Sequence, residues 1–163
     1  MISRDKLKSI LEEVTSERIE WIENTNPPTI QLKKDNILLI CTQLWSNSQT
    51  YFDHLSCITG LDNGPETGTM EVFYTLYSIP FNQSLMLKVE LPRENPEIES
   101  VASIWQSANW LEREIFDLYG IHFTNHPDLR RILMPGDWEG FPLRKDYQEP
   151  ETYRGIPTQE NQK

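Results

Sequence analysis

The segment from residue 110 to residue 147 places the tightest limit on how this chain can fold. Its first part carries apolar side chains at Leu111, Ile115 and Leu118, which is the i, i+4, i+7 spacing of one helix face. Gly120 follows where a helix C-terminal cap is expected. From residue 125 onward Pro and Gly recur too often for a long helix or strand to form. We therefore expect a helix that ends at Gly120 and then an irregular extended segment.

That irregular segment has the apolar content of a core without the regularity to fold alone, so it needs a surface to lie on. Its aromatic rings alternate with cations, and both residue types are enriched at protein interfaces. Solvated charge is the alternative interpretation for the cations, and ordinary core packing is equally open for Trp138. The predicted partner interface consists of Arg130, Arg131, Trp138, Phe141, Arg144, Lys145 and Tyr147.

Apolar periodicity assigns the remainder of the chain to alternating helices and strands. Their composition predicts one α+β domain in which helices pack on a mixed or antiparallel sheet. Residues 1–123 form this domain, and residues 124–163 form an extended partner-binding tail, disordered over 149–163 unless a partner holds it. The expected elements are a helix from Ser3 through Val14, a strand at 18–22, a hairpin of strands 30–33 and 37–43, a helix at 48–59, a hairpin of strands 70–78 and 85–91, and a helix from Pro96 through Trp105.

Charge and composition exclude several classes of function. A chain of 163 residues with a net charge of -10 repels polyphosphate, which argues against nucleic-acid binding and against an anionic membrane surface. The longest apolar run, Ile37 to Cys41, is far short of the ~20 residues that span a bilayer. The N-terminus lacks the apolar core of a signal peptide, so we expect a cytosol-like compartment.

Cofactor motifs are also missing from the sequence. Cys41 and Cys57 are the only cysteines, and two thiols cannot supply the four ligands of a typical iron–sulfur cluster or Cys₄ zinc site. We expect both to be small buried hydrophobic residues rather than a disulfide. Neither GxGxxG nor GxxxxGK occurs, which argues against a Rossmann or P-loop nucleotide site.

The order of residues in the organising segment resembles the signature of the 30-kilodalton subunit, or C subunit, of respiratory complex I. The resemblance covers about a quarter of the chain. Its structural signature residues are Glu112, Arg113, Glu114, Asp117 and His126, followed by the run Arg130-Arg131-Ile132-Leu133-Met134-Pro135, then Asp137-Trp138, Gly140 and Pro142-Leu143-Arg144-Lys145-Asp146-Tyr147. A weaker similarity lies upstream, in Phe52-Asp53-His54-Leu55 and Ile58-Thr59-Gly60.

The resemblance implies a cofactor-free structural subunit in the peripheral arm of a proton-pumping NADH:quinone oxidoreductase. Its tail would lie on the large quinone-side subunit, and a cluster-bearing subunit would be a second neighbour. Iron–sulfur clusters, FMN and quinone would belong to partner subunits, on the cytoplasmic side of the cell inner membrane. Similar subunits occur in ferredoxin-linked NDH-1-type complexes, F420-linked complexes and membrane-bound hydrogenases, so the electron donor stays open.

A different class of function is a stand-alone hydrolase that uses Glu112, Glu114, His122 and His126 as acid, base or metal ligands. Geometry disfavours it, since two side chains two positions apart on a helix point roughly 200° apart. We instead expect a structural network in which Arg113, with Arg130 or Arg131, neutralises the acids.

Two local contacts follow from this structural network. Arg113 and Asp117 have the i, i+4 spacing of a helix salt bridge. His126 precedes Pro127 and is expected to be a hydrogen-bonded turn residue rather than a proton relay.

Overall fold

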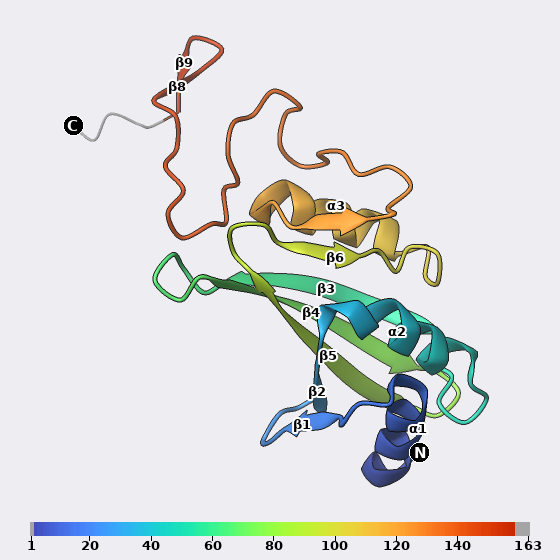
Figure 1. The fold of residues 1–163 in the computed structure, drawn as a ribbon. Helices are drawn as coiled ribbons and strands as arrows, with labels where there is room; N and C mark the ends of the chain where they lie inside the picture. Colours follow the sequence, from blue (N-terminus) through green and yellow to red (C-terminus); the bar gives the residue numbers. More distant parts are fainter. Residues whose placement is uncertain (1, 159–163) are drawn as a thin grey trace.

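The computed structural model describes residues 2–158 and consists of a mixed sheet, helices on its apolar face and a long irregular C-terminal segment (Figure 1). The fold class expected from the sequence, α+β in a single domain with a mixed sheet, is confirmed. In chain order the elements are α1 (Arg4–Thr15), β1 (Glu20–Ile22), β2 (Thr29–Leu32), η1 (Lys34–Asn36), α2 (Ile37–Ser46), β3 (His54–Asp62), β4 (Thr69–Ser78), β5 (Gln83–Pro92), β6 (Glu97–Glu99), α3 (Ala108–Tyr119), β7 (His122–Thr124), β8 (Thr152–Tyr153) and β9 (Ile156–Pro157).

The main sheet has the strand order β1-β2-β5-β4-β3. Its centre is the long hairpin of β4 and β5, which pair antiparallel over ten residue pairs from Thr69↔Pro92 to Ser78↔Gln83. β2 runs parallel to β5, and this single parallel pairing makes the sheet mixed. A second, two-stranded sheet pairs β6 with β7 in parallel. The predicted hairpin of strands 70–78 and 85–91 is thus confirmed.

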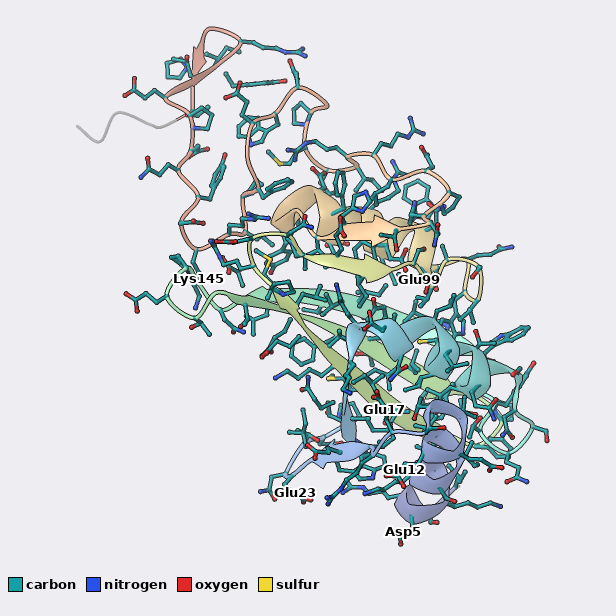
Figure 2. The ribbon with its side chains drawn as sticks, viewed as in Figure 1. Asp5, Glu12, Glu17, Glu23, Glu99 and Lys145 are labelled. Carbon is teal, nitrogen blue, oxygen red and sulfur yellow. The ribbon has the colours of Figure 1, made fainter. Side chains whose placement is uncertain are left out.

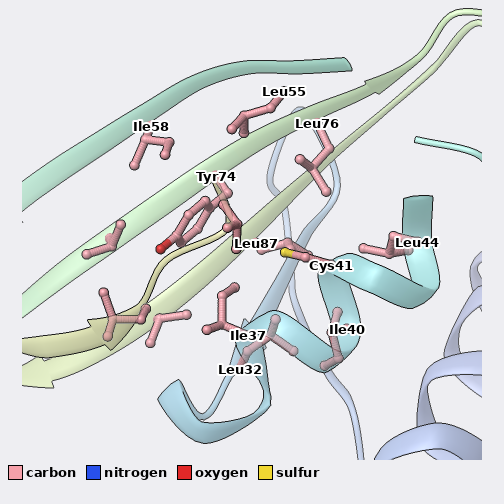
Figure 3. Close-up of a cluster of buried hydrophobic side chains, with 14 of the residues drawn as sticks. Leu32, Ile37, Ile40, Cys41, Leu44, Leu55, Ile58, Tyr74, Leu76 and Leu87 are labelled. Atoms are coloured by element: carbon pink, nitrogen blue, oxygen red, sulfur yellow. The ribbon is translucent and has the colours of Figure 1, made fainter. Parts of the chain in front are cut away.

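The core lies between the main sheet and the helices (Figure 3). Every second residue of β4 and β5 points into it, as the two-residue period of a strand requires, and α2 covers them with one apolar face. Burial of this apolar area supplies most of the free energy that holds the domain together. Side chains from both layers in this core include Ile37, Ile40, Cys41, Leu44, Tyr74, Leu76 and Leu87.

α3 packs on β3, and the two-stranded sheet of β6 and β7 lies beside α3 (Figure 1). The close approach depends on Gly60, where an added Cβ would lie 2.8 Å from the ring of Tyr119. α3 ends at Gly120, which has φ +72° and donates its N–H to the carbonyl of Phe116. A left-handed glycine cap stops the helix at this residue, as the sequence predicts.

α2 replaces a strand that the sequence analysis expected. The run Ile37 to Cys41 suggested a strand covered on both faces, and this prediction is wrong. Ile37, Ile40, Cys41 and Leu44 are all buried at the i, i+3, i+4, i+7 positions of a helix. The helical spacing becomes visible only when Leu44, beyond the predicted strand, is included.

β3 replaces the helix expected over residues 48–59, and this prediction is also wrong. Leu55 and Ile58 are buried three positions apart, a helical spacing. A β-bulge between Leu55 and Cys57 inserts one extra residue into the strand and shifts its inward-facing side chains by one position. The same shift leaves Cys57 exposed, which corrects the expectation that both cysteines are buried, whereas Cys41 is buried; both are free thiols.

The helix expected from Pro96 through Trp105 is absent. Residues 97–99 form β6, which pairs with β7, and turns follow up to α3. Ile98, Val101 and Trp105 are nevertheless buried, as the apolar pattern required. The strand forms because β7 offers a hydrogen-bonding edge, a long-range contact that periodicity cannot report.

After Thr124 the chain follows an irregular path above α3, on the side away from the main sheet (Figure 1). We call residues 125–158 the tail. The absence of a long helix or strand over 125–147 is as predicted. Residues 149–158 differ from the predicted disorder, because β8 and β9 pair as a short hairpin. The remaining residues of that prediction, 159–163, lie outside the described residues.

Candidate partner-binding segment

One carboxylate on α3 fixes the first part of the tail. Asp117 is fully buried, and its Oδ2 accepts backbone N–H bonds from Ile132, Leu133 and Met134 at 2.7–3.0 Å. Its Oδ1 accepts a bond of 2.7 Å from Nη1 of Arg131. Burial opposes ionisation, but these hydrogen bonds outweigh it and lower the pKa of Asp117. The ionised carboxylate therefore holds three consecutive residues of the tail.

The predicted salt bridge between Arg113 and Asp117 is not formed. Arg113 donates instead from Nε to the carbonyl of Arg130 at 3.1 Å and from Nη2 to the carbonyl of Arg131 at 3.4 Å. Its guanidinium carbon lies 5.3 Å from the ring centroid of Trp110, on the outer side of α3. Arg113 thus binds the tail backbone, and Arg131 supplies the cation that Asp117 needs.

A second buried carboxylate holds the tail further along, where the chain returns to the β3–β4 loop. Asp62 forms a bidentate pair with Arg93, with N···O distances of 2.8 and 3.1 Å. Its Oδ2 also accepts the backbone N–H of Lys145 at 2.8 Å. Arg93 also pairs with Asp146. Nζ of Lys145, a residue labelled in Figure 2, donates to the carbonyl of Asn63. The bond from Arg93 is the main reason that the pKa of Asp62 lies well below its usual range.

Sequence reasoning missed Asp62 and Arg93. They lie 31 positions apart at the ends of β3 and β5, and nothing in either local pattern connects them. The sequence offers only an acidic residue, Asp62, and does not indicate which cation pairs with it.

Phe141 lies in the part of the tail between the residues bound by Asp117 and the residue bound by Asp62. Its ring lies directly on Gly120, where an added Cβ would come within 2.5 Å of it. The guanidinium carbons of Arg131 and Arg144 lie 5.2 and 4.8 Å from the ring centroid. Arg144 also donates from Nε to the carbonyl of Tyr119 at 2.7 Å. Gly120 therefore caps α3 and, because it has no side chain, leaves room for the ring of Phe141.

Trp138, whose role the sequence left open, packs within the tail. Its Nε1 donates to the hydroxyl of Tyr147 at 3.0 Å, and its ring centroid lies 5.0 Å from that of Tyr153 on β8. Arg154 pairs with Asp137 across the same junction. These contacts attach the β8–β9 hairpin to the rest of the tail.

The four residues of the hydrolase alternative do not gather at one place. Glu112 is fully buried, and Nε2 of His126 lies 3.9 Å from its Oε2. Glu114 and His122 are exposed. An acid and base pair open to a substrate is not present in this arrangement.

The buried pair is bonded to the backbone around it. Glu112 accepts bonds from Oγ of Ser100 at 2.5 Å and from the N–H of Val101 at 2.7 Å. Burial raises the pKa of Glu112 to about 7, against the opposing effect of these two bonds. His126 Nε2 lies 3.0 Å from the carbonyl of Asn109, and its Nδ1 accepts the N–H of Asp128. Glu112 thus joins α3 to the segment after β6, and His126 joins α3 to the turn after β7.

Over residues 2–158, no group of three or more His, Cys, Asp or Glu side chains is placed to hold a metal ion. No helix among the same residues is long and apolar enough to cross a membrane.

A family model described as "Respiratory-chain NADH dehydrogenase, 30 Kd subunit" matches residues 30–153. The chain belongs to this family. The matched range contains the strands β3, β4 and β5, helix α3, both anchoring aspartates and nearly all of the tail. The match therefore spans most of the arrangement described above and is not confined to a short motif.

Individual relatives agree with this membership. The C subunit of the NADH-quinone oxidoreductase of Geobacter metallireducens is 44% identical over 120 residues, 73% of each chain. The corresponding protein of Chloroherpeton thalassium is 48% identical, but the match spans 43% of that longer protein. The C subunit of the F(420)H(2) dehydrogenase of Methanosarcina mazei is 41% identical over 147 residues, which cover 86% of this chain and 91% of the relative.

Solved structures share the fold. The trypsin-resistant fragment (1-134) of Nqo5 matches with a TM-score of 0.59 and 29% identity, over 76% of this chain and 98% of the fragment. A chain of the membrane-bound sulfane sulfur reductase, an archaeal respiratory membrane complex, matches with a TM-score of 0.73 over 88% of this chain and 84% of its own length. At 22% identity the second match shows the fold alone.

Proposed function

We propose that this chain is a structural subunit of a membrane-associated NADH:quinone oxidoreductase, with no active site of its own. It would support electron transfer from NADH to quinone by holding other subunits of the peripheral arm together. Family membership and relatives named as C subunits of NADH-quinone oxidoreductases support this proposal. Iron–sulfur clusters, FMN and quinone would then be carried by partner subunits, and the assembly would be peripheral on the cytoplasmic side of the inner membrane.

The single observation that carries the proposal is the tail itself. A long irregular segment is fixed on its own domain by two buried carboxylates and still presents apolar side chains to solvent. Leu133 is 60% exposed and Leu143 49% exposed, within a segment that forms no core of its own. Apolar groups on a rigid, preformed surface favour binding, because the ordering cost has already been met within the chain.

We assign the partner-binding role to residues 124–163 and the supporting domain to residues 1–123. The large quinone-side subunit is the proposed partner of the tail, and a cluster-bearing subunit is the second. The proposal does not depend on one electron donor, since a subunit of an F(420)H(2) dehydrogenase is 41% identical to this chain. A ferredoxin-linked or hydrogenase-type complex is the alternative setting for the same structural role.

Affinity purification tests the proposal. The tagged chain is isolated from its native membranes in mild detergent, and every retained protein is identified by mass spectrometry. Recovery of cluster-binding and quinone-binding subunits is the expected result, and the presence or absence of a flavin subunit narrows the donor. Recovery of the chain alone, as a soluble monomer, would contradict the proposal.

A further inference from the structure

Arg144 has hydrogen-bonding capacity that the rest of the described chain does not use. Its Nε donates to the carbonyl of Tyr119 at 2.7 Å. Within residues 2–158, neither Nη1 nor Nη2 has a hydrogen-bond or ion-pair partner. A guanidinium carries five N–H donors, so the outer edge of this group remains open for a ligand.

The other cations of the predicted interface are in different situations. Arg131 uses Nη1 on Asp117 and Nη2 on the carbonyl of Gly140. The side chain of Arg130 is 73% exposed, so water can solvate it. Arg144 is only partly exposed, but its unpaired Nη1 and Nη2 are not buried, so an acceptor from outside the chain can reach both.

The surroundings of Arg144 form a shaped site. A surface hollow of about 380 Å³ is lined by Phe141, Arg144 and Tyr147, among others. Phe141 lies under the guanidinium at 4.8 Å and is fixed on Gly120. The ring of Tyr147 lies against Gly140, where an added Cβ would be 3.0 Å from it. The Phe141 ring and the bond from Nε to Tyr119 together restrict the orientation of the guanidinium.

Charge and geometry decide what fits the hollow. Because Nε is occupied, the free fork consists of Nη1 and Nη2, whose spacing matches the two oxygens of a carboxylate. Glu139 and Asp146 also line the hollow, and their negative charge disfavours a doubly charged phosphate more than a singly charged carboxylate. We propose that this hollow binds the carboxylate of one Asp or Glu side chain of the large quinone-side subunit, the proposed partner of the tail. The inference rests on the proposed function, since it requires such a partner.

A zero-length cross-link tests this directly. Arg144→Lys places an amine at the site, and Lys145→Arg removes the neighbouring amine. The tagged variant is purified from native membranes in mild detergent and treated with a water-soluble carbodiimide, which joins an amine to a carboxylate in contact with it. Mass spectrometry should find position 144 linked to an Asp or Glu of another subunit. Arg18→Lys in the same Lys145→Arg background, at an exposed position outside the predicted interface, is the matched control and should give at least tenfold less of such a link.

The outcomes separate this inference from the proposed function. An intact complex with no link at position 144, or with links only to Glu139 or Asp146 of the same chain, overturns the carboxylate site. Loss of every partner already from the wild-type chain overturns the proposed function instead. If Arg144→Lys alone fails to assemble, a structure of the wild-type complex decides. Nη1 and Nη2 then either lie within about 3.5 Å of a partner carboxylate, or they do not and the inference is wrong.

Discussion

The β4–β5 hairpin and the tail are held in place by different forces. In the hairpin, alternate apolar side chains are buried and the backbone pairs residue by residue with its neighbour. In the tail, backbone N–H groups bond to the carboxylates of Asp117 and Asp62, and several apolar side chains remain exposed. Apolar burial stabilises the domain, whereas a few buried charges give the tail its shape. The two regions should respond differently to mutation and to pH.

The largest effect is expected at the junction of both regions. Ile115 is 4% exposed on the inner face of α3, and Ile115→Asp puts an unpaired charge into the core. This should cost more than about 4 kcal/mol and unfold sheet and tail together. Circular dichroism and thermal melting of the isolated chain measure it. Normal folding would show that the inner face of α3 does not carry the domain.

A change at Asp117 should separate the two regions. Asp117→Asn keeps the shape but removes the charge that binds Arg131 and three N–H groups, at a local cost of about 3 kcal/mol. Hydrogen exchange should become faster at residues 132–134 while β4 and β5 keep their protection. Asp137→Asn, which changes an exposed acid of the same tail, is the matched control. Equal loss of protection in β4 and β5 would mean that the tail and the sheet unfold as one unit.

Lowering the pH should also release the tail before the domain. The pKa values of Asp62 and Asp117 are depressed in the folded chain. Their contribution to stability is therefore full above the unfolded pKa of about 3.9 and is lost as the pH falls through the folded values. As the pH is lowered, the amide hydrogens of residues 132–134 and 145 should lose their protection from exchange first, and those of β4 only at a lower pH. Simultaneous loss of protection in both would contradict this order.

Glu112 should give the opposite pH dependence. Its pKa is raised to about 7 in the folded state, so the native chain binds more protons than the unfolded chain between about pH 4.3 and 7. Stability should fall by about 3 kcal/mol as the pH rises through this window. Glu112→Gln keeps an acceptor for Val101 and should remove the slope. Urea unfolding at pH 5 and pH 8 measures both chains, and parallel slopes would show that another group titrates.

The smallest effect is expected at the end of the tail. The ion pair of Arg154 with Asp137 is exposed on both sides, and pairs of this kind contribute little in water. Arg154→Ala should leave the melting temperature unchanged and should raise proteolysis only around the β8–β9 hairpin. A lower melting temperature for the whole domain would show that the hairpin supports the sheet.

Local patterns predicted the elements whose cause is local. The β4–β5 hairpin, the helix ending at Gly120 and the irregular tail follow from periodicity and from Gly and Pro positions. The errors at β3 and β6 have long-range causes, namely the bulge in the pairing with β4 and the pairing with β7. The error at α2 is local, since the predicted strand stopped short of Leu44, which completes the apolar face of the helix. The anchors of the tail were only half predicted. Arg131 was expected to bind an acid, but Asp62 and Arg93 meet only through the folded sheet.

The three N–H groups that converge on one oxygen of Asp117 have a further consequence. They form an anion-binding loop whose anion is built into the same polypeptide. Such a loop specifies its conformation through main-chain atoms, which every residue except proline can supply. The side chains of Ile132, Leu133 and Met134 are thereby released from determining the local fold. Substitutions at these positions can adapt the outer surface to a new neighbour while the path of the backbone stays the same.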